Sequence, residues 1–574
     1  MTSNGGVDLS LLTPVLERYE KGRRELLLPV LHEAQALYGY LPEPVLKAIS
    51  QNLRIPAADI YGVVEFYTMF YQQPVGRRIV RVCGDPACMA NGAPKVLEAV
   101  CRHAGVQPGE TTPDGALTIE RATCLGLCDQ APAALVDDRA LVGLTPADAP
   151  RLLAGEGREA ALRVTGDLRV LTRHIGVLDP LDLEAHRARG AFAGVEQALQ
   201  MPPEAVIAVV KDSGLVGRGG AAFPAGLKWE LGRKASGSPK YVICNADESE
   251  PGTFKDRLLI EGDPYRIIEG MLICAYAVGA SKGIFFLRGE YPRARAIVQE
   301  ALDRARAAGL LGERILGTDF SFDVELRVGA GAYVCGEETA LFEAVEGKRG
   351  FPRVKPPFPT DYGVFGKPTV ISNVETLASA PDILINGAEW FRQWGSGRSV
   401  GVKLFCVSGH VNHPGVIEAP FGIPLRELVE TYCGGFKGTP QAILMGGAAG
   451  AFITPQHLDV PLTYEALEPL GASIGSGAIM VFNESVDLRE LLSVLTHFFA
   501  HESCGKCYPC QLGTQRQHEI VTRAAAGRAL PGDVERLMDI GRTMTDASIC
   551  GLGQTAGMAV MSALRLWPDL LEAR

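Results

Sequence analysis

Eight of the fourteen cysteines occur in closely spaced sets, and the spacing of each set indicates a metal centre. Cys83 and Cys88 form a C-x4-C pair after a predicted strand, and Cys124 and Cys128 form a C-x3-C pair. Two thiolate pairs in loops of one small α/β unit suit a [2Fe–2S] cluster. Zinc also binds four thiolates, so the spacing alone leaves zinc and [2Fe–2S] as nearly equal alternatives.

A second cysteine set lies near the carboxyl end of the chain. Cys504, Cys507 and Cys510 follow a predicted helix in a C-x2-C-x2-C pattern. Three thiolates this close can hold three corners of a cubane, and Cys550 can supply the fourth ligand, which favours [4Fe–4S] over zinc. The two-cluster ferredoxin pattern does not apply, because Gln511 follows Cys510 and no C-x3-C-P run completes it.

A glycine-rich stretch at residues 217–229 is suited to bind an anionic, planar ligand. It contains four glycines in its first ten residues, which let backbone amides approach a phosphate closely. A flexible surface loop is the alternative, which we rank lower because Phe223, Leu227 and Trp229 are costly to expose to water. The glycine spacing differs from the dinucleotide fingerprint of a Rossmann turn.

Acidic segments follow two predicted strands, 241–245 and 322–328. Ligand sites in α/β sheets lie at the carboxyl ends of strands, so these acids predict a binding site. A solvated acidic loop is an equal alternative for the first segment taken alone. A proline-stiffened strip further on, with Lys355 and Phe358, is basic and aromatic and suits an anionic nucleotide.

Composition excludes several function classes. The net charge of −10 argues against nucleic acid as the main partner, because neutralising phosphates needs a basic face. The N-terminus lacks a basic region followed by an uninterrupted apolar core, so we predict no signal peptide. The most apolar window, 271–287, is too short and too polar for direct membrane insertion. We therefore expect a cytoplasmic protein whose cysteines are metal ligands or buried thiols, not disulfides.

The coarse pattern predicts how these residues are positioned. At 574 residues, the chain is long enough for three to five domains. Apolar residues at helical spacing predict a small bundle over 11–71, and helices are also expected at 94–103, 203–212 and 488–502. Strands are expected at 78–83, 241–245, 322–328 and 402–409. Residues from about 150 to 200 are predicted to be a linker with a connecting helix.

Two parts of the chain resemble subunits of respiratory complex I. The helical segment with its C-x4-C and C-x3-C pairs resembles the thioredoxin-like 24-kDa subunit. All four cysteine positions match, which shifts the prediction from zinc to [2Fe–2S]. From about residue 165 onward, the motifs resemble the NADH-oxidising 51-kDa flavoprotein subunit.

The resemblance implies an α/β multidomain fold. The implied parts are an N-terminal helical bundle (1–75), a thioredoxin-like [2Fe–2S] domain (76–155), a linker (156–200), a Rossmann-like FMN- and NAD-binding domain (201–398), a β-grasp, ubiquitin-like domain (399–482) and a helical [4Fe–4S] domain (483–574).

The cofactors implied by the resemblance are FMN, NAD, one [2Fe–2S] and one [4Fe–4S] cluster. A flavin is needed because NADH gives up a hydride, whereas iron–sulfur clusters accept one electron at a time. The implied FMN-binding residues are Gly217, Arg218, Gly219, Lys228, Asn245, Asp247, Glu248, Tyr333, Gly336, Glu337, Glu338, Ser372 and Asn373. NAD is expected to contact Phe223, Glu250, Lys355 and Phe358. Glu250 and Lys228 are the predicted catalytic positions.

Three positions depart from the family pattern. Ala222 replaces a frequent glycine, Ala225 replaces a common threonine, and Leu231 stands where a second aromatic ring often stacks on adenine. The last change is expected to weaken NAD binding without abolishing it. The acidic residues of the pocket favour NAD over NADP, whose extra phosphate they would repel.

Fusion of the two resembling parts in one chain predicts a diaphorase flavoprotein subunit of an NAD-reducing [NiFe] hydrogenase. Its expected partners are an iron–sulfur relay subunit and the hydrogenase catalytic subunit. The flavoprotein subunit of an NAD-dependent formate dehydrogenase and a fused respiratory complex I module are the alternatives. A hypothesis of a different class is a non-catalytic iron–sulfur electron-transfer scaffold. The intact glycine stretch argues against that scaffold.

Overall fold

The computed structural model describes residues 7–571. The first six residues of the predicted helical bundle and the last three of the predicted [4Fe–4S] domain therefore lie outside the described range. Within that range, no helix combines the length and apolar character needed to cross a membrane. All fourteen cysteines are free thiols, as expected for metal ligands and buried side chains.

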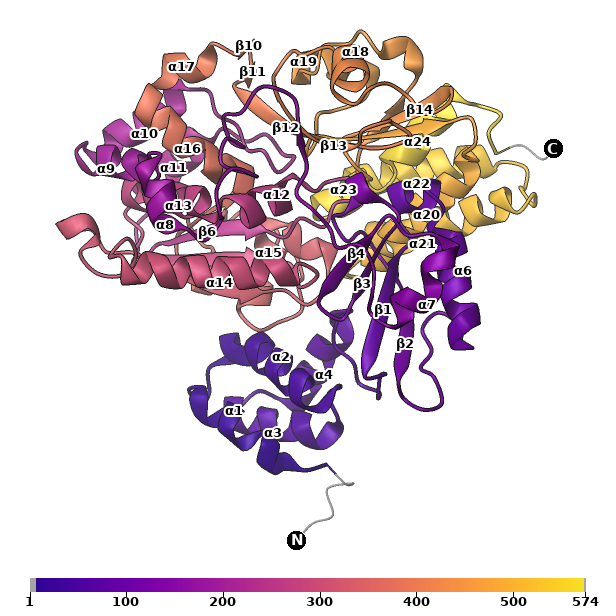
Figure 1. Cartoon of the computed structure of the whole chain (residues 1–574), viewed down its shortest axis with the longest axis horizontal. Coiled ribbons are helices and arrows are strands. Elements are labelled where there is room, and N and C mark those ends of the chain that lie inside the picture. The colour runs from indigo at the N-terminus through magenta and orange to yellow at the C-terminus, as the bar shows by residue number, and fades with distance from the viewer. Residues whose placement is uncertain (1–6, 572–574) are drawn as a thin grey trace.

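The N-terminal end forms a group of short helices beside a small sheet (Figure 1). The helices are α1 (Thr13–Arg18), α2 (Leu27–Tyr38), α3 (Glu43–Leu53) and α4 (Ala57–Phe66). The sheet has the order β2-β1-β3-β4 and contains β1 (Arg78–Cys83), β2 (Leu117–Ala122), β3 (Ala133–Val136) and β4 (Arg139–Val142). The helices that accompany this sheet are α5 (Pro86–Ala90), α6 (Ala93–Ala104) and α7 (Ala149–Leu153).

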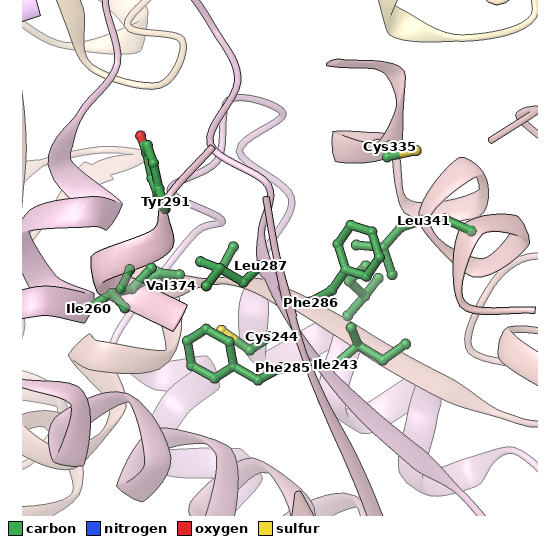
Figure 2. Close-up of a cluster of buried hydrophobic side chains, with 14 of the residues drawn as sticks. Ile243, Cys244, Ile260, Phe285, Phe286, Leu287, Tyr291, Cys335, Leu341 and Val374 are labelled. Carbon is green, nitrogen blue, oxygen red and sulfur yellow. The ribbon is translucent and has the colours of Figure 1, made fainter. Parts of the chain in front are cut away.

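The central region is built on a parallel sheet with the order β8-β7-β6-β9. Its strands are β6 (Tyr241–Ala246), β7 (Lys282–Leu287), β8 (Asp323–Val328) and β9 (Thr369–Asn373). Parallel strands need crossover connections, which keep apolar side chains covered on both faces. Figure 2 shows this packing: Phe285 and Phe286 lie on neighbouring positions of β7, near Cys244 and Ile243 of β6.

Helices connect and cover these parallel strands. They are α10 (Pro203–Asp212), α11 (Ala225–Lys234), α12 (Lys255–Gly262), α13 (Pro264–Val278), α14 (Pro292–Ala307), α15 (Glu338–Val345), α16 (Val374–Asn386) and α17 (Ala388–Arg392). Helix α13 is buried along almost its whole length, which explains why the most apolar window of the chain overlaps it.

The segment 156–200 is more ordered than the predicted linker. It contains β5 (Val164–Thr165), which pairs with β13 (Gly415–Pro420), and the helices α8 (Leu183–Ala188) and α9 (Ala193–Leu199). Buried histidines fasten it: His174 Nδ1 lies 2.8 Å and His186 Nδ1 3.3 Å from the Asp263 carboxylate. The segment therefore packs on both the central region, through Asp263, and the sheet that contains β13.

A second, six-stranded sheet follows, with the order β15-β14-β16-β12-β13-β5. Its remaining strands are β12 (Val402–Gly409), β14 (Pro440–Met445), β15 (Ala451–Ile453) and β16 (Ala478–Asn483), and a short pair is formed by β10 (Gly395–Ser396) and β11 (Ser399–Val400). Two short helices accompany it, α18 (Leu425–Glu427) and α19 (Tyr464–Leu467). The carboxyl end is helical: α20 (Leu488–Glu502), α21 (Tyr508–Ala525), α22 (Asp533–Ala547), α23 (Gly551–Thr555) and α24 (Met558–Leu566).

Candidate cofactor sites

The glycine-rich stretch forms a tight loop before α11. The loop closes through a hydrogen bond from Gly217 N to Phe223 O of 2.8 Å. A Cβ at Gly219 would lie 3.2 Å from the Asn373 side chain, so glycine lets the loop approach the end of β9 closely. Phe223 exposes 42% of its surface, and Lys228 Nζ lies 5.7 Å from the centre of its ring.

Arg218 points away from this loop surface. Its guanidinium group is buried, donates to Val400 O at 2.9 Å and lies 4.7 Å from the centre of the Phe421 ring. Its backbone amide donates to Thr376 Oγ1 at 2.8 Å. The side chain therefore anchors the loop to the second sheet and the amide anchors it to Thr376, so neither group is directed at a ligand on the loop.

The predicted residues of four separate segments meet at the carboxyl end of the parallel sheet. Asn245 and Asn373 are register partners at the ends of β6 and β9. The Asn245 amide donates to Gly336 O at 2.8 Å, which brings in the segment before α15. From α11, Lys228 Nζ donates to Ile371 O at 3.2 Å and lies 3.7 Å from the Glu338 carboxylate. Ser372 is buried beside these groups in β9.

The acidic side chains differ in what they can offer a ligand. Burial raises the pKa of Asp247 and of Glu250 to about 7 each. Glu250 accepts hydrogen bonds from the Tyr333 hydroxyl and, at 2.8 Å, from Ala449 N of the second sheet region. Both carboxylate oxygens of Glu248 instead accept amides at the start of α12, at 2.7 and 2.9 Å. The Glu248 carboxylate thus caps the start of α12, and its predicted contact with FMN stays a prediction.

Glu337, Glu338 and Lys355 form a charged group at the start of α15. Lys355 Nζ lies 3.0 Å from Glu337 and 2.5 Å from Glu338. Glu337 also caps α15, because its carboxylate accepts the amides of Thr339 and Ala340. Phe358 lies in the loop after Lys355 with 55% of its surface exposed, so it is open to a ligand.

These residues fit an anionic, planar cofactor such as FMN beside a second nucleotide. Gly219 has no side chain where the loop comes closest to Asn373. Lys228 offers an ammonium group, and Phe223 offers an exposed ring. Sequence reasoning did not assign a role to Thr376 or Lys255. Lys255 is fully buried and bonds the Asp256 and Glu375 carboxylates at 2.6 and 2.9 Å. Thr376 lies three residues after Asn373, at the start of α16. This closeness to a predicted site residue was the sequence signal that could have identified it.

The four N-terminal cysteines form one buried group. Cys83 ends β1, Cys88 lies in α5, and Cys124 and Cys128 lie in the loop after β2. The Sγ atoms of Cys124 and Cys128 lie 3.4 Å apart. A hydrogen bond from Cys128 lowers the pKa of the Cys124 thiol to about 6, and the nearby Arg288 charge acts in the same direction. Four convergent, buried thiols with no disulfide fit the predicted [2Fe–2S] cluster.

The four C-terminal cysteines surround a small cavity between the ends of α20 and α22. The cavity is lined by Val334, Pro352, Ser503, Cys504, Lys506, Cys507, Cys510, Ile549, Cys550 and Leu552. Cys510 is buried, but Cys504, Cys507 and Cys550 are partly exposed. Lys506 Nζ donates to Pro352 O at 2.7 Å and ties this loop to the central region. Four thiols that come from two segments and line one cavity fit the predicted [4Fe–4S] cluster.

Family profiles match most of the chain in the same order. They are a thioredoxin-like [2Fe-2S] ferredoxin (12–155), a Nuo51 FMN-binding domain (210–382), an SLBB domain (404–447) and an NADH-ubiquinone oxidoreductase-F iron-sulfur binding region (490–574). The chain thus carries an FMN-binding domain and two iron–sulfur regions.

Relatives and solved structures extend this finding. The chain is 38% identical to the "NAD-reducing hydrogenase HoxS subunit alpha" of Cupriavidus necator, over 98% of this chain and 94% of that protein. It is 44% identical to an NADH-quinone oxidoreductase subunit of Rhizobium meliloti, over 69% of this chain and 95% of that protein. A solved structure of an air-oxidised NAD+-reducing [NiFe]-hydrogenase matches with a TM-score of 0.86 and 35% identity, covering 97% of this chain and 94% of that one. The chain belongs to the family of NADH dehydrogenase flavoproteins that join a 24-kDa-like [2Fe–2S] domain to a 51-kDa-like FMN and [4Fe–4S] unit.

Proposed function

We propose that this chain is the diaphorase subunit of an NAD-reducing hydrogenase. In this role it exchanges a hydride between NAD(H) and FMN and passes single electrons to or from the iron–sulfur clusters. The observation that carries the proposal is the near full-length similarity to a hydrogenase subunit, which includes the fused N-terminal part. The quinone oxidoreductase relative is itself matched almost completely, yet it accounts for only 69% of this chain.

Bound FMN would supply the conversion between two-electron hydride transfer and one-electron transfer. We assign the FMN site to the glycine-rich loop at Gly217, Arg218 and Gly219, with Lys228 as the cation. Asn245, Asp247, Glu248, Tyr333, Gly336, Glu337, Glu338, Ser372 and Asn373 are the other proposed FMN contacts, Glu248 through its backbone. These residues position a ligand and exclude water, and such preorganisation lowers a barrier without a proton donor.

We assign the NAD side to Phe223, Glu250, Lys355 and Phe358. The Phe223 and Phe358 rings are both exposed and can stack on planar groups. We assign Glu250 to the nicotinamide side, and the Tyr333 hydroxyl and Ala449 N hold its carboxylate in place. The carboxylates of Glu337 and Glu338 would oppose an additional phosphate, so we infer that NAD is the substrate and not NADP.

We propose that the relay subunit docks over the C-terminal cysteines. Beside the partly exposed cluster ligands, Tyr508 exposes 76%, Leu512 55% and Ile549 36% of its surface. Tyr508 and Leu512 are four residues apart on α21, so they lie on one helix face. An exposed apolar patch next to partly exposed cluster ligands suits the docking of an electron-transfer partner. We further propose a cytoplasmic complex, with a formate dehydrogenase catalytic subunit as the alternative partner.

Two measurements test the proposal. The purified chain should contain FMN and both clusters, and NADH should reduce ferricyanide or a viologen through it. Absence of FMN and of this activity would leave the iron–sulfur scaffold as the function. Metal analysis of the co-purified complex then separates the partners: nickel is expected, whereas molybdenum or tungsten would indicate a formate dehydrogenase.

A further inference from the structure

One buried arginine connects the two candidate cofactor regions of the chain. Arg288 follows β7 directly, and its side chain reaches the backbone of the N-terminal cysteine Cys124. Its Nη1 donates to Glu248 O at 2.5 Å, and its Nη2 donates to Cys124 O at 2.7 Å. Glu248 lies in the acidic segment of the proposed FMN site, and Cys124 is a proposed cluster ligand. A single guanidinium group therefore bonds the backbone of both sites.

The surrounding contacts hold the same two loops together. Arg257 Nε donates to Gly126 O at 2.9 Å, two residues after Cys124. The Tyr291 hydroxyl donates to the Glu248 carboxylate at 3.0 Å, and Tyr291 lies beyond the end of β7 in Figure 2. Gly126 has a φ of +66°, and a Cβ there would lie 1.9 Å from the Tyr291 hydroxyl. The cysteine loop is thus packed against the central region without space for a side chain.

Arg288 also places a positive charge beside the cysteine group. Its side chain exposes only 2% of its surface, so solvent screens its charge weakly. The Glu290 carboxylate lies 2.9 Å from Nη2 and offsets part of this charge. A one-electron reduction adds negative charge to an iron–sulfur cluster, and a nearby cation stabilises the reduced form. Hydrogen bonds and local charge are the means by which proteins set cluster potentials.

We propose that Arg288 is a positioning residue that fixes the loop of Cys124 against the acidic segment at Glu248 and raises the reduction potential of the [2Fe–2S] cluster. This inference rests on the proposed function, because it presupposes that the FMN and cluster sites are filled. Arginine is suited to the role because its planar fork bonds two carbonyl groups at once, which a lysine ammonium does with less fixed geometry.

The test is a redox titration of the full chain followed by EPR, comparing the wild type with Arg288→Gln and Arg288→Lys. In Arg288→Gln, we expect the equilibrium constant for [2Fe–2S] reduction to fall about tenfold, which is about 59 mV for a one-electron couple. Arg288→Lys keeps the charge and should show a smaller fall. The [4Fe–4S] cluster of the same sample serves as an internal reference and should not shift.

Arg304→Gln is the matched control. Arg304 lies on α14 of the same region and also donates to a backbone carbonyl, that of Leu181, but it is exposed. Its substitution should leave both potentials unchanged. An unchanged [2Fe–2S] potential in Arg288→Gln would overturn the inference. If Arg288→Gln does not assemble the cluster, Arg288→Met, which also removes the charge, takes its place, and an unchanged potential there has the same consequence. A wild type without FMN or clusters would instead defeat the proposed function.

Discussion

The two cysteine groups are enclosed in opposite ways. All four N-terminal cysteines are buried, and Arg288 and Arg257 cover their loop from the central region. Three of the four C-terminal cysteines are partly exposed, and apolar side chains of α21 lie on the surface beside them. The first group is linked through Arg288 to the acidic segment of the proposed FMN site, whereas the second is partly exposed to solvent.

This difference suggests a division of labour between the proposed clusters. We infer that electrons leave the chain at the C-terminal group, because it lies beside the proposed docking surface. We infer that the buried N-terminal group exchanges electrons within the chain, as a side branch from the flavin. Substitutions that affect one group and spare the other can test the comparison.

The largest effect is expected for Cys504→Ser. A serine hydroxyl is a poor ligand for iron compared with a thiolate, so the [4Fe–4S] cluster should be lost. NADH-driven electron transfer to the relay subunit should then fall by at least about 100-fold, since a catalytic relay is interrupted. Ferricyanide reduction, which can take place at the flavin, should persist. Unimpaired transfer to the relay subunit would show that electrons leave by another route.

A smaller effect is expected on the surface beside the same cysteines. Leu512→Asp places a charge in the proposed interface and should weaken partner binding about tenfold, or about 1.4 kcal/mol. The measurement is the amount of relay subunit retained by the tagged full chain at increasing salt. Leu530→Asp is the control, because Leu530 is equally exposed, at 53%, but lies in the loop between α21 and α22. Equal retention by both variants would remove this surface from the interface.

The sequence predicted many local features of this molecule. The bounds of β1, α10, β12 and α20 agree with the predicted ranges, because their apolar periodicity is clear and capping or turn residues flank them. The meeting of Asn245 with Asn373 also follows from sequence, since parallel strands end at the same edge of a sheet. The proposed domain borders, including those of the 156–200 segment, remain predictions.

Other features depend on contacts between residues distant in sequence. The Arg218 side chain turns toward Phe421, in a different sheet region, which its own glycine-rich surroundings do not indicate. Likewise, Arg288 bonds Cys124, and His174 bonds Asp263, across other elements of the fold. Such partners are chosen by burial and charge in the folded chain, so local pattern does not specify them.

Glu250 bears on the comparison because it has neighbours in or near both cysteine groups. Tyr333, its hydrogen-bond donor, packs against Phe498 of α20 at 5.0 Å, and burial raises the pKa of Glu250 to about 7, with the Cys124 charge acting in the same direction. An ionised Glu250 favours the positively charged ring of NAD+. The affinity for NAD+ should therefore rise a few-fold, roughly 1 kcal/mol, as pH increases through this pKa. In Glu250→Gln that pH dependence should vanish, as measured by NAD+ titration of the full chain; a persisting dependence would point to another group.

The smallest effect on turnover is expected for Cys83→Ser. This variant should lose the [2Fe–2S] EPR signal, because one of four thiolates is removed, and keep the [4Fe–4S] signal. If the buried group is a side branch, NADH oxidation with the relay subunit should fall by less than about twofold, under about 0.5 kcal/mol of activation free energy. A loss as large as that of Cys504→Ser would place both clusters in one chain of transfer. The difference in burial between the two cysteine groups would then concern stability and not electron transfer. Comparing the two variants in one assay therefore decides between these roles.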